Sequence, residues 1–388
     1  CPFRTWSGSS VVPASGPMAP ATTDEVVEGV RQAGASGTSL ALRAGGTKDR
    51  LGRATPAATC MDLSALTGIV TYEPDELILI ARPATPLAQV QALLAEGSQH
   101  LAFEPPFWGP GATLGGTIGV AASGPRRFVA GAARDFVLGM ELVDGRGRVI
   151  RAGGRVVKNV TGYDLWRSMV GAYGTLGVMT EICLKLWPRP ETQSTLAVGG
   201  LSRQQALTQM FAWSRRPEAI SGLSYTAGDR PLWVRVEGST AAVPPQIETL
   251  RCDAEEGDIL DEAASLVHWE RQREGGGLQS AEGEILYRIV LPPSRADVAV
   301  TALEGLAECR WCLDWAGGLL WVVLPQTSPA SAVHEIAVDN RGVAARVGSS
   351  AQDPNEDAFT PLSEPVARLN RTLQQALDPQ GVFRSGRL

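Results

Sequence analysis

One stretch of the chain, residues 109–124 (GPGATLGGTIGVAASG), restricts the possible folds more than any other. More than half of its residues are glycine or alanine. An irregular loop of this length is uncommon inside a compact domain. Glycine has no Cβ atom, so backbone rich in glycine can approach another group closely. The stretch therefore predicts a segment whose backbone packs against something flat and bulky.

A second glycine-rich turn lies near the N-terminus, in residues 40–52 (LALRAGGTKDRLG). Its short apolar run ends at Arg43, and two glycines, a threonine and Lys48 follow. Glycines directly after a buried strand let backbone N–H groups approach an anion. The turn matches neither the GxxxxGK[ST] phosphate loop nor the GxGxxG dinucleotide motif. It therefore indicates a phosphate-binding turn of another kind.

Length and charge limit the class of protein. A chain of 388 residues is too long for one ordinary core, so we expect two or three domains. The formal net charge of −6 argues against nucleic acid as the main partner. No apolar run approaches the roughly 20 residues that span a membrane. The proline- and serine-rich start, residues 1–21, predicts a tail.

Cysteine and histidine are too scattered to predict a metal centre. The six cysteines lie at positions 1, 60, 183, 252, 309 and 312, and the C-x-x-C at 309–312 alone supplies too few ligands for a structural zinc ion or an iron–sulfur cluster. The three histidines lie at positions 100, 268 and 334. We therefore expect reduced core cysteines, a cytoplasmic location and no metal.

Strand and helix patterns alternate in the first half of the chain, which favours α/β units. Two prolines close this half near residue 190. The predicted elements are helices at 22–34, 85–97 and 163–174, strands at 39–43, 76–83 and 175–190, and a hairpin at 136–154 with Asp144–Gly145 as its turn.

The second half predicts an α+β domain with an antiparallel sheet. Residues 309–325 indicate a strand pair that turns at Gly317–Gly318. Residues 253–283 are acidic and rich in glycine, and they predict a surface excursion, a segment that leaves the fold and lies on its surface. The other elements are helices at 202–216, 294–308, 331–338 and 363–379 and strands at 232–238 and 284–293. Six tryptophans of this half suit either a packed core or a partner surface: Trp213, Trp233, Trp269, Trp311, Trp315 and Trp321.

Four glycine-containing segments occur in a fixed order: RAGGTK at 43–48, GATLGGTIG…SG at 111–124, GYDLWRSMVGAYGTLGVMTE at 162–181, and DPQGVFRSG at 378–386. Taken alone, each is a weak signal, since GAYGTLG at 171–177 also suits a helix end followed by a strand. Together they resemble the FAD-binding flavoproteins of the vanillyl-alcohol oxidase type. Within that family the chain is similar to the FAD-binding subunits of bacterial glycolate oxidases.

The resemblance implies an α+β fold. Its parts are a tail (1–21), a PCMH-type FAD-binding domain of two α/β subdomains (22–190), an α+β cap domain with an antiparallel sheet (191–362), and a C-terminal helix and segment that return to the FAD domain (363–388).

The resemblance also implies FAD as the cofactor, with its pyrophosphate held by backbone N–H groups of residues 44–48. Members with covalent flavin carry histidine where this chain has Thr47, so noncovalent FAD is expected. The implied FAD-binding residues are Arg43, Ala44, Gly45, Gly46, Thr47, Lys48, Pro110, Gly111, Ala112, Thr113, Gly115, Gly116, Thr117, Ser123, Gly124, Arg126, Gly174, Thr175, Gly177, Val178 and Arg384.

Alternatives stay open for the cations in this set. Lys48 also suits a solvated surface position. Arg126 or Arg127 suits a place near the flavin, where a cation stabilises its anionic reduced form. A salt bridge to Asp135 or an exposed face is the alternative. Arg384 stands, with Ser385, where relatives often carry Asn-Pro.

One departure from the family concerns catalysis. Its 2-hydroxy-acid dehydrogenases carry a GDGNxH-type motif whose histidine helps to bind a metal, whereas the equivalent WAGGLLWVVLP (315–325) has no histidine. Removing an alcohol hydride requires a base or metal that takes the O–H proton. We therefore expect a chain that binds FAD but is poorly equipped to oxidise a hydroxy acid alone, and its catalytic residues remain unknown.

The resemblance supplies partners for such a chain. It implies a glycolate-oxidising complex, forming glyoxylate, with a flavoprotein D-type subunit and an iron–sulfur F-type subunit. The complex would be cytoplasmic or peripheral to the inner face of the cell membrane. The alternatives are an autonomous FAD-dependent 2-hydroxy-acid dehydrogenase and a non-catalytic assembly subunit with structural FAD.

Overall fold

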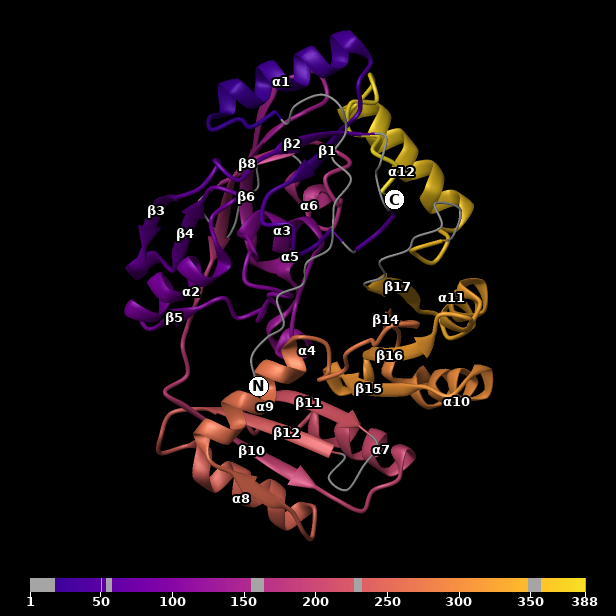
Figure 1. Ribbon diagram of the computed structural model, residues 1–388. Helices are drawn as coiled ribbons and strands as arrows, with labels where there is room; N and C mark the ends of the chain where they lie inside the picture. The colour runs from indigo at the N-terminus through magenta and orange to yellow at the C-terminus, as the bar shows by residue number, and fades with distance from the viewer. Residues whose placement is uncertain are drawn as a thin grey trace.

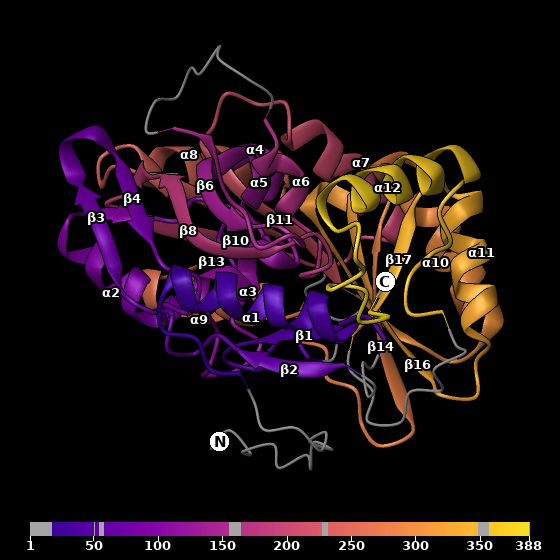
Figure 2. The ribbon, with the colours of Figure 1, turned by 90° about the horizontal axis from the view of Figure 1, so that it is seen from above.

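The computed structural model describes residues 18–49, 51–53, 58–154, 164–226, 232–347 and 357–387. They form a first lobe (18–190), a second lobe (191–347) and a C-terminal segment (357–387) that packs back on the first lobe (Figures 1 and 2). Most of the predicted N-terminal tail lies outside the described residues, as do residues 155–163, which include the first two residues of the third glycine segment.

The first lobe begins with a small parallel unit. Strands β1 (Leu40–Arg43) and β2 (Thr59–Asp62) pair in parallel, and helix α1 (Thr23–Ser36) packs on them. The helix starts where the sequence predicts, because the Thr22 side chain accepts a hydrogen bond from the Glu25 N–H at 3.2 Å. Val382 and Phe383 of the C-terminal segment complete this core.

A five-stranded antiparallel sheet forms the rest of the first lobe. Its order is β3-β4-β8-β6-β7. The predicted hairpin at 136–154 is confirmed as the β6–β7 pair, and Asp144 holds its turn by accepting from the N–H groups of Arg146 and Arg148. The elements are β3 (Ile69–Glu73), β4 (Ile78–Ala81), β6 (Val137–Val143), β7 (Val149–Gly153), β8 (Val178–Lys185), α2 (Leu87–Glu96), α3 (Leu114–Gly119), α4 (Arg127–Ala130), α5 (Ala133–Phe136), and the short pair β5 (Gln99–His100) and β9 (Trp187–Pro188).

The helix predicted at 163–174 is mostly wrong. In the described residues it shrinks to the single turn α6 (Trp166–Met169). Gly171, Tyr173 and Gly174 all adopt positive φ angles, which no right-handed helix tolerates. This irregular backbone leads into β8.

The second lobe is an eight-stranded antiparallel sheet in the order β13-β10-β12-β11-β15-β16-β14-β17. Helices α7, α8, α10 and α11 contribute to one apolar core with this sheet. The elements are β10 (Thr192–Val198), α7 (Arg203–Trp213), β11 (Ile220–Thr226), β12 (Leu232–Gly238), α8 (Val243–Asp253), β13 (Asp258–Leu260), α9 (Glu262–Arg273), β14 (Glu284–Val290), α10 (Ala296–Leu306), β15 (Arg310–Asp314), η3 (Trp315–Gly317), β16 (Leu319–Pro325), α11 (Ala330–Asp339) and β17 (Val343–Val347).

Residues 253–283 are not a surface excursion, which corrects the sequence prediction. They supply edge strand β13 and helix α9, which packs on the sheet. Trp269 of α9 is buried and donates its indole N–H to Thr195 Oγ1 at 2.8 Å. A Cβ atom at Gly222 would lie 2.6 Å from the Trp269 ring, so glycine makes room for the indole. α9 lies between the sheet and the first lobe (Figure 1).

Tryptophans of the second lobe serve mainly as core residues. Trp213, Trp269, Trp315 and Trp321 are buried, whereas Trp233 and Trp311 are half-buried. No helix in the described part of the chain is long and apolar enough to cross a membrane.

The C-terminal segment is anchored by one buried carboxylate. After helix α12 (Glu364–Leu377), Asp378 accepts hydrogen bonds from the N–H groups of Val382 and Phe383, each at 2.8 Å. Asp378→Ala leaves both buried donors unsatisfied and is expected to lower the free energy of unfolding by about 3 kcal/mol. Urea denaturation measures this loss. The exposed Asp339→Ala serves as the control, with a change below about 0.5 kcal/mol; equal losses would contradict the anchoring role.

Candidate functional site

The glycine turns of the first lobe meet in a groove of about 110 Å³. The groove is lined by the turn after β1, the start of α3, the backbone before β8 and the C-terminal segment. The structure brings together these sequence-predicted residues: Arg43, Ala44, Gly45, Gly46, Thr47, Lys48, Gly111, Thr113, Gly115, Gly116, Gly174 and Gly177.

Two of the glycines touch through their backbones. A Cβ atom at Gly45 would lie 1.5 Å from the carbonyl oxygen of Gly111, and one at Gly111 would lie 2.6 Å from the carbonyl oxygen of Gly45. Gly46 next to them has a φ of +71°, a conformation that favours glycine. The wall of the groove is therefore backbone, and any side chain at these positions would fill it.

The turn after β1 presents a row of free donors. In the part of the chain that the structure describes, no protein acceptor takes the amide hydrogens of residues 44–48. Successive amides in a turn with one left-handed residue form a concave site that binds anions. The donor set and the glycine wall thus fit the two phosphates of a dinucleotide cofactor.

Lys48 adds a cation to this wall. Its side chain is only 7% exposed, so it is not a solvated surface residue. Nζ donates to the carbonyl of Phe107 at 2.6 Å and to Thr47 Oγ1 at 3.2 Å, and it lies 4.7 Å from the centre of the Trp108 ring. Burial lowers the pKa of Lys48 to about 8, although the nearby Glu274 carboxylate opposes this shift.

Cofactor binding should depend on pH through Lys48. A bound anion favours the protonated amine, so FAD affinity should be constant below pH 8 and fall as the pH rises above the lowered pKa of about 8. Titration of the FAD-free chain with FAD, followed by flavin fluorescence, measures this. Lys48→Arg stays charged and should remove the fall. An identical pH profile in both proteins would contradict the role of Lys48.

The groove is also lined by residues that the sequence did not predict. Tyr173 lines it with a φ of +54°, and Arg387 donates to the backbone carbonyls of Leu51, at 3.0 Å, and Lys48. Met169 and Met179 add apolar surface. Arg384, the predicted cation of this segment, is exposed and does not line the groove. The resemblance predicted that this segment returns to the FAD domain, but it pointed to Arg384 rather than to Arg387.

Several predicted residues do not line the groove. Ser123 Oγ accepts from the Ala133 N–H, the Gly124 carbonyl accepts from Trp315 Nε1, and Thr175 Oγ1 donates to the Ala172 carbonyl. These bonds hold backbone in place, and the Gly124 bond joins the two lobes. Pro110, Ala112, Thr117 and Val178 are likewise absent from the groove lining.

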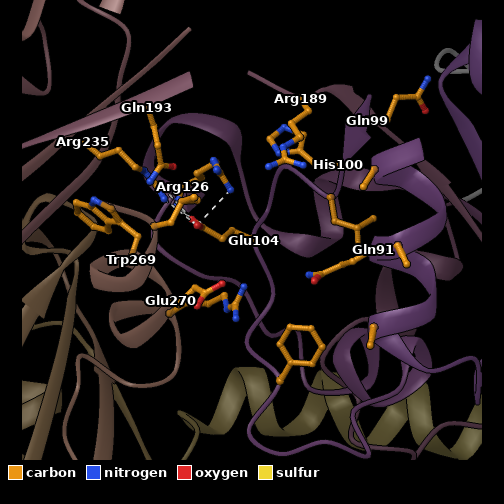
Figure 3. Close-up of a pocket in the computed structure, with 17 residues that line it drawn as sticks. Gln91, Gln99, His100, Glu104, Arg126, Arg189, Gln193, Arg235, Trp269 and Glu270 are labelled. Carbon is orange, nitrogen blue, oxygen red and sulfur yellow. Dashed lines mark hydrogen bonds and ion pairs between the residues drawn. The ribbon is translucent and has the colours of Figure 1, made fainter. Parts of the chain in front are cut away.

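Arg126 does not line the groove, does not pair with Asp135 and is half-buried. The salt bridge to Asp135 and the exposed face were therefore wrong for this residue, and its place near the flavin stays a prediction. Its Nε donates to Glu237 at 2.8 Å, and its Nη1 lies 3.2 Å from Glu104. Arg235 makes two hydrogen bonds to Glu104, at 2.8 and 2.9 Å. Glu104 and Arg126 belong to the first lobe and the other two residues to β12, so this interlobe ion cluster ties the lobes together. Figure 3 shows three of its members, Glu104, Arg126 and Arg235.

The ion cluster stays charged at neutral pH. Burial alone would raise the pKa of Glu104, but the guanidinium groups of Arg126 and Arg235 outweigh it and hold that pKa below its usual value. The pKa of Glu237 is lowered in the same way. Glu104, Arg126 and Arg235 form part of the wall of a cavity of about 460 Å³ between α2 and α9 (Figure 3). His100 lines the same cavity, and burial lowers its pKa to about 4.

Histidines of the second lobe have structural contacts. The His268 ring stacks on Trp233 with 4.1 Å between centroids, and His334 bonds to Thr360 Oγ1 and the Asp357 carbonyl. Within the described ranges, no group of three or more His, Cys, Asp or Glu side chains is placed to hold a metal ion.

Comparison with known proteins identifies the family. Residues 14–153 match the profile of an FAD binding domain. The chain is 38% identical to glycolate oxidase subunit GlcE of Escherichia coli (strain K12), over 94% of this chain and 96% of that protein. The chain belongs to the GlcE family. FAD as the cofactor and membership of the FAD-dependent oxidoreductases are thereby confirmed.

Other relatives of this GlcE family member are more distant. Glycolate oxidase subunit GlcD of Bacillus subtilis (strain 168) is 49% identical over 22% of the chain and 18% of that protein, and D-lactate dehydrogenase of Archaeoglobus fulgidus is 30% identical over 56% and 51%. An alkyldihydroxyacetonephosphate synthase structure superposes with a TM-score of 0.66 at 13% identity, covering 94% of the chain and 75% of that structure. This likeness supports the predicted fold, a PCMH-type FAD-binding domain with antiparallel sheets.

Proposed function

We propose that this chain is the noncovalent FAD-binding subunit of a multi-subunit complex that oxidises glycolate or a related 2-hydroxy acid. Similarity to GlcE along almost the whole chain supports the role of a subunit. The observation that carries the proposal is the groove itself, in which five free amides, Lys48 and a glycine wall suit a dinucleotide.

The groove offers little for deprotonating an alcohol. FAD accepts electrons when bound, but the O–H proton of the substrate still needs a base. Among the described residues, the ionisable groups that line the groove are Arg43, Lys48, Asp49, Tyr173 and Arg387. Its one carboxylate, Asp49, already pairs with Arg43 at 2.9 Å. We therefore assign substrate deprotonation to a D-type flavoprotein subunit and onward electron transfer to an iron–sulfur F-type subunit.

Anaerobic addition of glycolate or D-lactate to the purified, FAD-loaded chain tests the proposal. The flavin absorbance of the chain alone should not change, whereas the assembled complex should bleach this flavin as well as that of the D-type subunit. Complex rebuilt with FAD-free chain provides the control. Bleaching of the isolated chain would show an autonomous dehydrogenase. A flavin that never bleaches in the working complex would show a structural cofactor.

A further inference from the structure

The end of helix α9 contacts the first lobe through one carboxylate. Glu274 follows the last residue of α9, and its Oε1 accepts from the Phe107 N–H at 3.0 Å while its Oε2 accepts from the Trp108 N–H at 2.8 Å. Arg273 supports this carboxylate, since its Nε donates to Glu274 Oε1 at 3.0 Å. Hydrogen bonds to a charged carboxylate are roughly twice as strong as bonds between neutral groups. One side chain of the second lobe therefore holds two consecutive backbone amides of the first.

Packing inside the second lobe fixes the position of Glu274. Helix α9 is anchored by the buried Trp269 and by Gln272, whose Nε2 donates to Cys312 Sγ at 3.2 Å. Directly after the helix, Gly276 has a φ of +67°, and a Cβ atom there would lie 2.8 Å from the Cβ of Cys312. Glycine thus lets the chain turn closely past β15. The carboxylate is therefore placed by contacts of its own lobe.

The loop that Glu274 holds has an unfavourable backbone conformation. Trp108 adopts a φ of +52°, which is rare for a residue with a bulky side chain. Such a conformation persists only where its surroundings hold it. The Trp108 ring also packs edge-on against Trp321 of β16, with 6.4 Å between centroids. The carboxylate of Glu274 and the ring of Trp321 therefore keep residues 107–108 in place from the second lobe.

The same loop supports the groove of the first lobe. The Phe107 carbonyl accepts from Lys48 Nζ at 2.6 Å, and the Trp108 ring lies beside the same ammonium group. Gly111, three residues after Trp108, belongs to the glycine wall. A shift of residues 107–108 would therefore move both the acceptor of Lys48 and the wall. Glu274 lies one residue contact away from each of them.

Glu274 also acts on Lys48 through its charge. Burial lowers the pKa of Lys48 to about 8, and the Glu274 carboxylate opposes this shift. Among the described residues, the other titratable or charged side chains that line the groove or adjoin Glu274 are Arg43, Asp49, Tyr173, Arg387 and Arg273. Asp49, the one carboxylate in this set, pairs with Arg43. Glu274 is therefore the group that favours the protonated amine.

We propose that Glu274 is a positioning residue through which the second lobe sets the FAD affinity of the groove. This role rests on the FAD site of the proposed function, and it adds a determinant outside the groove, because Glu274 does not line it. Glu274 acts through the backbone of residues 107–108 and through the charge of Lys48. Separation of the lobes would release both amides, so the cofactor site depends on contact between the lobes.

Titration of the FAD-free Glu274→Gln chain with FAD, on both sides of pH 8, tests this role. The amide keeps one oxygen acceptor but loses the second acceptor and the charge, so FAD affinity at neutral pH should fall about tenfold. The pH at which affinity starts to fall should also move below its wild-type value of about 8, because Lys48 loses the carboxylate that favours its protonated form.

Glu270→Gln is the matched control. Glu270 lies one turn earlier on α9 and is exposed, so its loss should change FAD affinity less than about twofold and leave the pH profile unchanged. Equal results for the two variants would overturn the proposal. Weaker binding by Glu274→Gln with the wild-type pH profile would also overturn it, since general damage to the fold does not shift a pKa. A wild-type chain that binds no FAD would instead refute the proposed function.

Hydrogen–deuterium exchange of the FAD-free wild-type chain requires no variant. Pro105 and Pro106 carry no amide hydrogen, so a peptide of residues 104–108 reports on Phe107 and Trp108. Both amides should exchange slowly although they lie in a loop, because the Glu274 carboxylate binds them. Exchange at the rate of an unfolded chain would contradict the positioning role.

Discussion

Gly45→Val is expected to yield a folded chain that retains no FAD. A Cβ atom at this position would lie 1.5 Å from the Gly111 carbonyl oxygen, and neither backbone can move away without opening the groove. The two turns that supply the glycine wall and the free amides would therefore separate. Absorbance of the purified protein gives the flavin-to-protein ratio, and circular dichroism monitors the fold.

Gly305→Val is the matched control for this experiment. Gly305 lies in α10, and a Cβ atom there would meet nothing within 4 Å, so the flavin ratio should equal that of the wild-type chain. Retention of FAD by Gly45→Val at the wild-type ratio would show that the cofactor binds elsewhere.

Arg235→Met should cause the largest loss of stability. It removes both hydrogen bonds to Glu104 and leaves that buried carboxylate with Arg126 as its remaining partner. Breaking a buried ion pair from one side costs about 3–5 kcal/mol. Denaturant unfolding should show this loss in the free energy of unfolding. The double variant Arg235→Met/Glu104→Gln should regain part of it, because the unpaired charge is gone.

An exposed pair provides the comparison. Arg251 and Glu248 are paired on α8, and each side chain is about half exposed. Arg251→Met should cost at most about 1 kcal/mol. If Arg235→Met costs no more than Arg251→Met, the interlobe ion cluster does not hold the lobes together.

Local signals in the sequence predicted much of the first lobe. Asp144–Gly145 marked the β6–β7 hairpin, and Thr22 marked the start of α1. The prediction of a surface excursion at residues 253–283 failed at α9. The charged residues of this helix suggested a solvent-exposed segment, although one of its faces, which includes Trp269, is buried. The helix prediction also failed at α6, because the positive φ of Tyr173 is a tertiary property that no spacing reveals.

The candidate site was predictable where backbone alone forms it. Gly45 and Gly111 lie in glycine turns whose composition already indicated close backbone contact. Arg126 was misplaced because its carboxylate partner Glu237 lies 111 positions away on another lobe. Arg387 was missed because the resemblance pointed to Arg384 of the same segment, and which arginine lines the groove depends on the folded backbone. Side chains placed by contacts distant in sequence thus account for the errors.

The central claim is that the turn at residues 44–48 and its glycine wall hold one FAD without a covalent bond. The most direct measurement is the amount of flavin released when the purified chain is denatured and the polypeptide is removed. The account predicts one FAD per chain in the supernatant. A colourless chain that takes up no added FAD, or flavin that stays attached to the denatured polypeptide, would contradict it.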